Sequence, residues 1–458
     1  MKNIMILFTL VFASMSAHAN SDIVNRVERF DWDGIDVVWL QDDRLPLFNI
    51  QVYFADGALS DDPSRMGETE FMFTMLSEGT RRFSASEIAD SLEFFGSSYG
   101  ASVVHEYSQF KVSGLLEHMA PTMEMVCHMF QDSTFPRERI NNALAKRKAQ
   151  LENSIRNHGW LANRAFRELS LRGSPFYYPT DGKINDLDRV TRTQLREKRN
   201  YFNNDVKKRI YLTGPREVLG LRNIIREQCG WRGHEEQFVR RAEFPPVKIE
   251  DGPQVFVVEV PSANQAQVRI GRILNPGEYD DHYSMLLANN FLGGGFTSRL
   301  MREVRASRGL TYSIGSMAAA QRDYGRALIS TSTPAPRVTD LLEVITNTVQ
   351  SAMTEIDSED LERSRGNLIG SHPFQFESPE GVLGRMMFLD HQERPYDELT
   401  HFPQRVAEVT KEQVKEQLTA LFRLDRQVIV VLGEADLAEQ LREAGYKNVI
   451  TMSFRDFL

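Results

Sequence analysis

Residues 67–80 read Gly67-Glu68-Thr69-Glu70-Phe71-Met72-Phe73-Thr74-Met75-Leu76-Ser77-Glu78-Gly79-Thr80. We expect a helix here, and on a helix the side chains of residues three and four positions apart share one face. That face carries the Glu70 carboxylate, the Phe73 ring and the Thr74 hydroxyl. Phe73 can neither accept a proton nor polarise a water, and Thr74 is a poor zinc ligand. The segment therefore lacks a local metal site.

A second distinctive stretch lies in the C-terminal part of the chain. It reads Leu292-Gly293-Gly294-Gly295-Phe296-Thr297-Ser298-Arg299-Leu300-Met301-Arg302-Glu303-Val304-Arg305-Ala306-Ser307-Arg308-Gly309-Leu310-Thr311-Tyr312-Ser313. The glycines are not a phosphate loop, because no Gly-Lys-Ser/Thr follows, so we expect them to allow close backbone approach or to flex. Taken alone, Arg305 fits a solvated helix residue paired with an acid such as Glu303, and Tyr312 fits an aromatic at a core edge.

Both stretches resemble the insulinase and pitrilysin family of zinc peptidases. The first follows the pattern G-x-x-H-F-x-E-H-M-x-x-x-G-T and keeps these positions: Gly67, Phe71, Met75, Gly79 and Thr80. The second follows L-G-G-G-x-x-S-R-L-x-x-x-V-R-x-x-R-G-L-x-Y-S at nearly every position. In H-x-x-E-H the two imidazoles hold zinc and the carboxylate activates a water. Here those three positions carry Glu70, Phe73 and Thr74.

A further zinc ligand of this family is a Glu on a later helix. Residues 175–182 match the family pattern P-x-x-x-P-x-x-G, and counting back from Pro175 puts Gln150 at the Glu position. Glu152 is near, but two residues along a helix turn a side chain by about 200°. All the catalytic positions are therefore altered, and we expect no metal or other cofactor in this chain.

The resemblance also implies a role for Arg305 and Tyr312, which lie seven residues apart. Tyr312 would donate a hydrogen bond to the developing oxyanion of the scissile carbonyl, and Arg305 would hold the substrate backbone. The chain resembles the two-chain branch of the family, which includes mitochondrial processing peptidase. The resemblance thus implies a noncatalytic subunit of a heterodimeric zinc peptidase, inactive alone, with zinc in a homologous H-x-x-E-H-bearing partner and extended peptides as substrates.

Two other functions remain open at this point. One is a homodimeric pseudopeptidase that binds peptides or acts as a scaffold without cleavage. The other is a self-sufficient metallohydrolase that uses Glu70 with Glu152, Glu78 or His105. No local set among these supplies three protein ligands and a general base, which disfavours the second function.

The length and an internal repeat predict two domains. The 458 residues exceed what one hydrophobic core usually serves. Residues 191–214 align without gaps with residues 410–433, at an offset of 219 (410 minus 191), and each copy predicts an amphipathic helix followed by an apolar strand. We place the domains at residues 20–230 and 254–458, joined by a polar, proline-containing linker at residues 231–253.

The fold class follows from the presence of segments with the periodicity of strands and of segments with the periodicity of helices. Residues 49–54, 255–260 and 428–432 predict strands, whereas residues 137–157 and 338–356 predict long helices. We therefore predict an α+β protein with a duplicated pair of domains, each with a mixed β-sheet layered with helices, as in the family it resembles.

The N-terminus and the composition indicate where the protein acts. Lys2, an apolar run at residues 4–13 and Ala17-His18-Ala19 predict a signal peptide at residues 1–19, and so export to a periplasm or to the cell exterior. No later stretch predicts a membrane span. The net charge of -9 gives no basic stripe for nucleic acid. Cys127 and Cys229 either form a disulfide or remain buried thiols.

Overall fold

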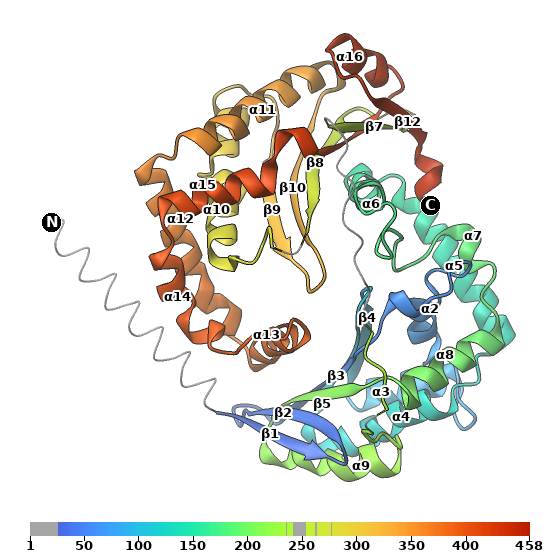
Figure 1. The fold of residues 1–458 in the computed structure, drawn as a ribbon. Coiled ribbons are helices and arrows are strands. Elements are labelled where there is room, and N and C mark those ends of the chain that lie inside the picture. The colour runs from blue at the N-terminus through green and yellow to red at the C-terminus, as the bar shows by residue number, and fades with distance from the viewer. Residues whose placement is uncertain (1–25, 235, 241–252, 262, 276) are drawn as a thin grey trace.

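The structure is a computed structural model that describes residues 26–234, 236–240, 253–261, 263–275 and 277–458 (Figure 1). The predicted signal peptide at residues 1–19 lies outside the described residues, as do residues 241–252 of the predicted linker. We call residues 26–240 the N-terminal half and residues 253–458 the C-terminal half.

Strands and helices alternate irregularly in both halves. The N-terminal half contains β1 (Val27–Trp32), β2 (Ile35–Gln41), β3 (Leu47–Phe54), α2 (Glu68–Met75), α3 (Ala85–Phe94), β4 (Ser98–Val103), β5 (Ser108–Leu115), α4 (Met119–Asp132), α5 (Arg137–Ser154), α6 (His158–Ser170), α7 (Ile184–Leu187), α8 (Arg192–Asn204), β6 (Lys208–Gly214) and α9 (Leu221–Glu227). The C-terminal half contains β7 (Gln254–Glu259), β8 (Ala266–Leu274), α10 (His282–Gly293), β9 (Ile314–Ala320), β10 (Gly325–Thr333), α11 (Val338–Thr354), α12 (Ser358–Ser371), α13 (Pro379–His391), α14 (Glu398–Glu408), α15 (Lys411–Phe422), β11 (Val428–Gly433), α16 (Leu437–Glu443) and β12 (Val449–Ser453).

Each half contains one six-stranded mixed sheet. The strand orders are β1-β2-β6-β3-β5-β4 and β12-β7-β11-β8-β10-β9. In the first sheet β2 and β6 are parallel, and in the second β7 is parallel to both β11 and β12, while the remaining pairs are antiparallel. The predicted α+β architecture of two domains, each a mixed sheet layered with helices, is confirmed.

The two sheets repeat one plan. Strands β2-β6-β3-β5-β4 have the same order and directions as β7-β11-β8-β10-β9. The helix before β6 and the helix before β11 also begin alike. Thr191 caps α8 in a capping box with Gln194, and Thr410 caps α15 in a capping box with Gln413. The equivalence of residues 191–214 and 410–433 is therefore confirmed in three dimensions.

Each half contributes one helix to the sheet of the other half (Figure 1). Leu383 and Met386 of α13 pack with Val38 and Tyr211 of the N-terminal sheet in one buried cluster. In the opposite direction, α6 packs on β8 and β11 through a cluster that includes Phe166. The opposite face of each sheet is covered by helices of its own half. The central strands of both sheets are thus buried on both faces, and the halves are joined by a reciprocal exchange of helices.

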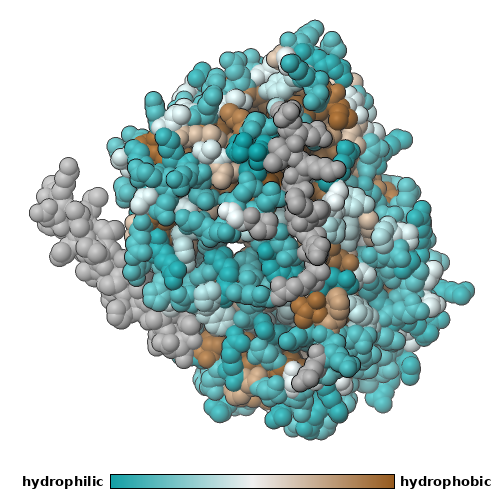
Figure 2. Space-filling view, in the orientation of Figure 1, coloured by the Kyte–Doolittle hydropathy of each residue, from teal (hydrophilic) through white to brown (hydrophobic). Residues whose placement is uncertain are grey.

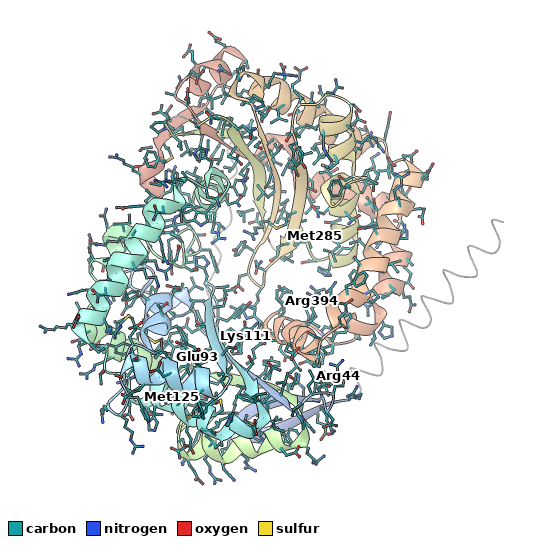
Figure 3. All side chains as sticks on the ribbon, turned by 180° about the vertical axis from the view of Figure 1, so that it is seen from behind. Arg44, Glu93, Lys111, Met125, Met285 and Arg394 are labelled. Atoms are coloured by element: carbon teal, nitrogen blue, oxygen red, sulfur yellow. A yellow bond between two sulfur atoms is a disulfide. The ribbon has the colours of Figure 1, made fainter. Side chains whose placement is uncertain are left out.

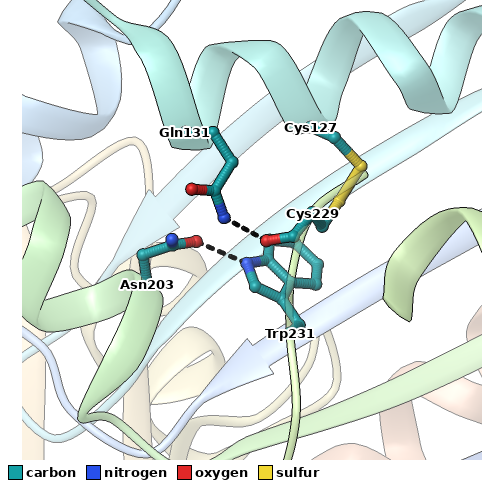
Figure 4. The surroundings of a disulfide bond; sticks show 5 residues. All are labelled: Cys127, Gln131, Asn203, Cys229 and Trp231. Carbon is teal, nitrogen blue, oxygen red and sulfur yellow. Dashed lines mark hydrogen bonds between the residues drawn. A yellow bond between two sulfur atoms is a disulfide. The ribbon is translucent and has the colours of Figure 1, made fainter. Parts of the chain in front are cut away.

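A disulfide fastens the end of the N-terminal half. Cys127 of α4 is bonded to Cys229, which follows α9, and the two Cα atoms are 4.4 Å apart (Figure 4). Gln131 donates a hydrogen bond to the carbonyl of Cys229, and the Trp231 indole donates one to Asn203. Trp231, where the predicted linker begins, is buried in the N-terminal core. The question of a disulfide or two thiols is thereby answered in favour of the disulfide.

The surface is mostly hydrophilic, and hydrophobic residues appear on the viewed face in small separate groups (Figure 2). Seen from behind, Lys111 of β5 and Arg394, which follows α13, both lie near the boundary between the halves (Figure 3). Among the described residues we find no helix with the length and apolar character needed to cross a bilayer.

Candidate functional site

Helix α2 begins at a glycine that no other residue could replace easily. Gly67 has a φ of 91°, and a Cβ there would lie 2.7 Å from Gly182, so two landmarks of the sequence meet at this point. The Asp61 carboxylate accepts hydrogen bonds from the backbone N–H groups of Gly67 and Thr69, both at 2.9 Å. Burial raises the pKa of Asp61 to about 6. The backbone of the degenerate motif is therefore held firmly in place.

Glu70 is engaged by a cation from α5. Arg147 donates a hydrogen bond to its carboxylate, and both side chains are partly buried. This ion pair joins α2 to α5, which is also the helix that carries Gln150. A carboxylate neutralised by an arginine is a poorer ligand for a divalent cation than a free one, because the guanidinium already occupies its lone pairs.

Phe73 lies in the hydrophobic core of the N-terminal half. It is 2% exposed, and its ring makes edge-to-face contacts with Phe54, Phe130 and Phe202 at centroid distances of 5.7, 6.3 and 5.2 Å. Of the three side chains expected on one face of this helix, Phe73 is thus buried, Glu70 is partly buried and Thr74 is exposed. The boundary between the buried and the exposed sides of α2 passes between Phe73 and Thr74, which are about 100° apart around the helix.

The remaining positions of the motif also lack metal-binding chemistry. Thr74 is exposed, and its hydroxyl donates to the Glu70 carbonyl at 3.1 Å. Gln150 is exposed on α5, one turn after Arg147. The residues present therefore do not fit a zinc ion. Across the described ranges, no group of three or more His, Cys, Asp or Glu side chains is arranged to hold a metal.

The residues considered for a self-sufficient metallohydrolase have other surroundings. His105 is buried, and its Nε2 hydrogen-bonds the Tyr178 carbonyl at 2.8 Å. Burial lowers the pKa of His105 to about 4. Glu78 pairs with Arg139 at 3.6 Å, and Glu152 is exposed on α5. No described hydrogen bond or ion pair connects any of the three with Glu70.

Arg305 and Tyr312 lie together in the C-terminal half. Arg305 belongs to a π-helical turn, Met301–Ala306, and its guanidinium lies over the rings of Tyr312 and Phe296 at 5.3 and 5.8 Å. Both aromatic side chains are strongly exposed, Tyr312 by 85% and Phe296 by 83%. Single π-helical turns occur often at functional sites. The alternative of an Arg305–Glu303 ion pair is wrong, because Glu303 pairs with Arg302 instead.

A surface groove of about 540 Å³ adjoins these residues, and it is lined by Phe296, Thr297, Met301, Arg302, Arg305, Ala306 and Arg363. Asp360 pairs with Arg302 at 2.6 Å and with Arg363 at 2.7 Å. Arg305 forms no ion pair or hydrogen bond with any described side chain. The N–H donors of the Arg305 guanidinium are therefore available to bind another molecule at this groove.

The backbone around the groove depends on glycine as expected. A Cβ at Gly293 would lie 2.5 Å from the Ser316 amide nitrogen, so the first glycine of the triplet does allow close backbone approach. Gly294 is similarly close to Asn290, whereas nothing lies near Gly295.

The structure thus assembles two separate groups of residues. Glu70, Thr74 and Gln150 belong to α2 and α5, while Arg305 and Tyr312 belong to the C-terminal half, and no described hydrogen bond, ion pair or ring contact joins the groups. Arg147 and Phe296 were not predicted as site residues from the sequence. Arg147 stands one helical turn before Gln150, and Phe296 directly follows the glycine triplet, so position relative to the motifs is the signal that points to both.

Comparison with known proteins agrees with this geometry. Residues 37–175 match the model of the insulinase family, peptidase family M16, and residues 190–368 match the model of the peptidase M16 inactive domain. The uncharacterized zinc protease YmxG of Bacillus subtilis is 26% identical over 73% of this chain and 81% of its own. The non-peptidase homolog YmxG of Helicobacter pylori is 20% identical over 75% of this chain and 79% of its own.

Solved structures share the fold. A peptidase M16 inactive domain from Pseudomonas fluorescens superposes with a TM-score of 0.78 at 21% identity, over 89% of this chain and 98% of the other. A protease from Helicobacter pylori gives a TM-score of 0.74 at 15% identity, over 89% and 99% of the two chains. Together the two family models span most of the described residues. The chain therefore belongs to peptidase family M16, the insulinase family, as a noncatalytic member whose zinc-binding positions carry other side chains.

Proposed function

We propose that this protein is the noncatalytic subunit of an exported, heterodimeric zinc peptidase. In this proposal Arg305 and Tyr312 act on a peptide whose hydrolysis uses the zinc and the general base of a homologous H-x-x-E-H-bearing partner. The observation that carries the proposal is the exposure of Tyr312 and the absence of a described ion-pair partner for Arg305. A purely structural pair would be expected to be buried or neutralised.

The chemistry of the two side chains suits the hydrolysis of an amide. The Tyr312 hydroxyl would donate to the oxygen on which negative charge develops as water attacks the carbonyl. One well-placed donor of this kind lowers a barrier by about 3 to 4 kcal/mol, because it meets charge that exists only in the transition state. Arg305 presents several N–H donors in a plane, which suits a peptide carbonyl. The Phe296 ring, stacked on Arg305, would limit the orientations of that plane.

An extended peptide also has a site at which it can add to the sheet. Strand β9 begins two residues after Tyr312 and pairs only with β10 among the described strands, so no described strand occupies its other edge. Such an edge can accept a peptide as a further strand, with little dependence on the peptide's sequence. Strand addition to β9 would bring the peptide close to Arg305 and Tyr312.

Reconstitution of the two purified chains tests the proposal. Peptidase activity should require both chains, and Tyr312→Phe should lower turnover by about 10²-fold while the complex still elutes as a heterodimer. Tyr177→Phe, at a partly exposed tyrosine of the N-terminal half, is the matched control and should leave turnover unchanged. Full activity of the partner alone, or wild-type turnover of the Tyr312→Phe complex, would refute the shared site. Peptide binding without any cleavage would favour a peptide-binding scaffold.

A further inference from the structure

The C-terminal half contains a largely apolar cavity of about 160 Å³ between its sheet and α11. Its floor is a row of three isoleucines, since Ile270 of β8 lies directly opposite both Ile329 of β10 and Ile429 of β11. Its other walls include Leu342, Val349, Phe422, Leu424, Gln427 and Tyr446. Apolar cavities of roughly 150 Å³ can take up one benzene molecule.

The internal repeat explains why space remains here. At the offset of 219 between the halves, Ile329 corresponds to Phe110 of β5 (329 minus 110) and Val349 corresponds to Phe130 of α4 (349 minus 130). In the N-terminal half those two rings pack edge to face with centroids 5.0 Å apart, and Phe130 also packs on Trp231. At these two positions, therefore, aromatic rings fill the space in the N-terminal half, and smaller aliphatic side chains leave it open in the C-terminal half.

One buried acceptor makes the cavity more than a packing defect. Gln427 is 3% exposed, and its Nε2 donates to the Arg423 carbonyl at 2.7 Å. Because a carbonyl only accepts, this bond fixes the amide orientation. The Gln427 Oε1 is buried and has no hydrogen-bond partner among the described residues. A buried acceptor without a donor is costly, and such groups are usually satisfied by a bound molecule.

We propose that this cavity binds a small single-ring aromatic molecule that carries a hydrogen-bond donor, of which phenol is the simplest example. The ring would lie on the row of Ile270, Ile329 and Ile429, and its hydroxyl would donate to Gln427 Oε1. Partly exposed side chains at Leu424 and Tyr446 line the same cavity and give the ligand a route from solvent. Neither Arg305 nor Tyr312 lines this cavity, and the site does not depend on the proposed peptidase role.

The test is binding of phenol and of benzene to the full-length protein, followed by calorimetry and by the shift of Tm. Phenol should bind and raise Tm by about 2 °C or more at concentrations well above its Kd. Benzene should bind more weakly, because it cannot donate to Gln427. Absence of phenol binding up to its solubility limit would overturn the proposal.

Two variants test separately how the cavity volume and the hydrogen bond to Gln427 contribute to binding. Val349→Phe installs the residue of the N-terminal half, so it should abolish binding of both molecules. Gln427→Leu removes the acceptor, and it should lower the affinity for phenol about five-fold while leaving that for benzene unchanged. Gln350→Leu, at an exposed position of α11, is the matched control and should bind like the wild type. If Val349→Phe fails to fold, the ratio of phenol to benzene affinity in Gln427→Leu still decides, and an unchanged ratio contradicts the proposal.

Discussion

Phe73 occupies the position of the general-base glutamate in the family pattern and is buried in the core. A substitution back to glutamate should therefore destabilise the folded protein. Phe73→Glu would place a carboxylate among Phe54, Phe130 and Phe202, and we expect it to lower the free energy of unfolding by about 3 to 5 kcal/mol. Thr74→His, one residue further on the exposed side of α2, should change stability by less than about 0.5 kcal/mol. Denaturant unfolding measures both, and equal effects would contradict the burial of Phe73.

The buried His105 should make the free energy of unfolding sensitive to acid. Its pKa is lowered to about 4 by burial, while an unfolded histidine titrates near 6.5. Between these pH values the unfolded chain therefore binds more protons than the folded chain. The free energy of unfolding is then unaffected by His105 above pH 6.5 and decreases as the pH falls toward 4. The loss should reach about 2 kcal/mol at pH 5. His105→Gln should remove that part of the pH dependence measured by unfolding at pH 7 and pH 5, and exposed His401→Gln should not.

At the scale of elements, the two capping boxes allow a test of the internal repeat. Thr191→Ala and Thr410→Ala each remove the side chain that caps a helix, and each should lower the free energy of unfolding by about 1 kcal/mol. The two effects should add, because one site lies in the N-terminal half and the other in the C-terminal half, and they share no partner. Thr419→Ala, within α15, should be neutral or stabilising, since alanine has the higher helix propensity. A loss at only one cap would argue against equivalence.

Elements were predictable where the signal is local. The strand at residues 428–432 and the helix at residues 338–356 follow from periodicity, and the repeat follows from matching caps and apolar strands. Partners distant in sequence were not predictable. The sequence of α13 contains many apolar residues but does not indicate that they lie on the sheet of the other half. The Glu70–Arg147 ion pair could not be predicted from the sequence for the same reason, since 77 residues separate its members.

For the whole molecule, the exchanged helices should hold the halves together without the covalent link. A protein cut at a protease site engineered between residues 241 and 252 should elute as one species in native buffer, because α6 and α13 each bury apolar side chains on the opposite sheet. Leu383→Asp should weaken this association, since Leu383 is 2% exposed and packs in the contact. Separation of the wild-type fragments after cutting would contradict the exchange. Glu416→Gln, at an exposed position of α15 within the C-terminal half, serves as the control.

The exchange also sets an order of events during synthesis. Strand β6 completes the N-terminal sheet at Gly214, but α13, which covers one of its faces, begins only at Pro379. A nascent chain must therefore carry an uncovered apolar sheet while a further 165 residues (379 minus 214) are added, at a stage when exposed strands tend to aggregate. Shielding by a chaperone should matter most while the intervening residues emerge, and release of the finished polypeptide should end that need.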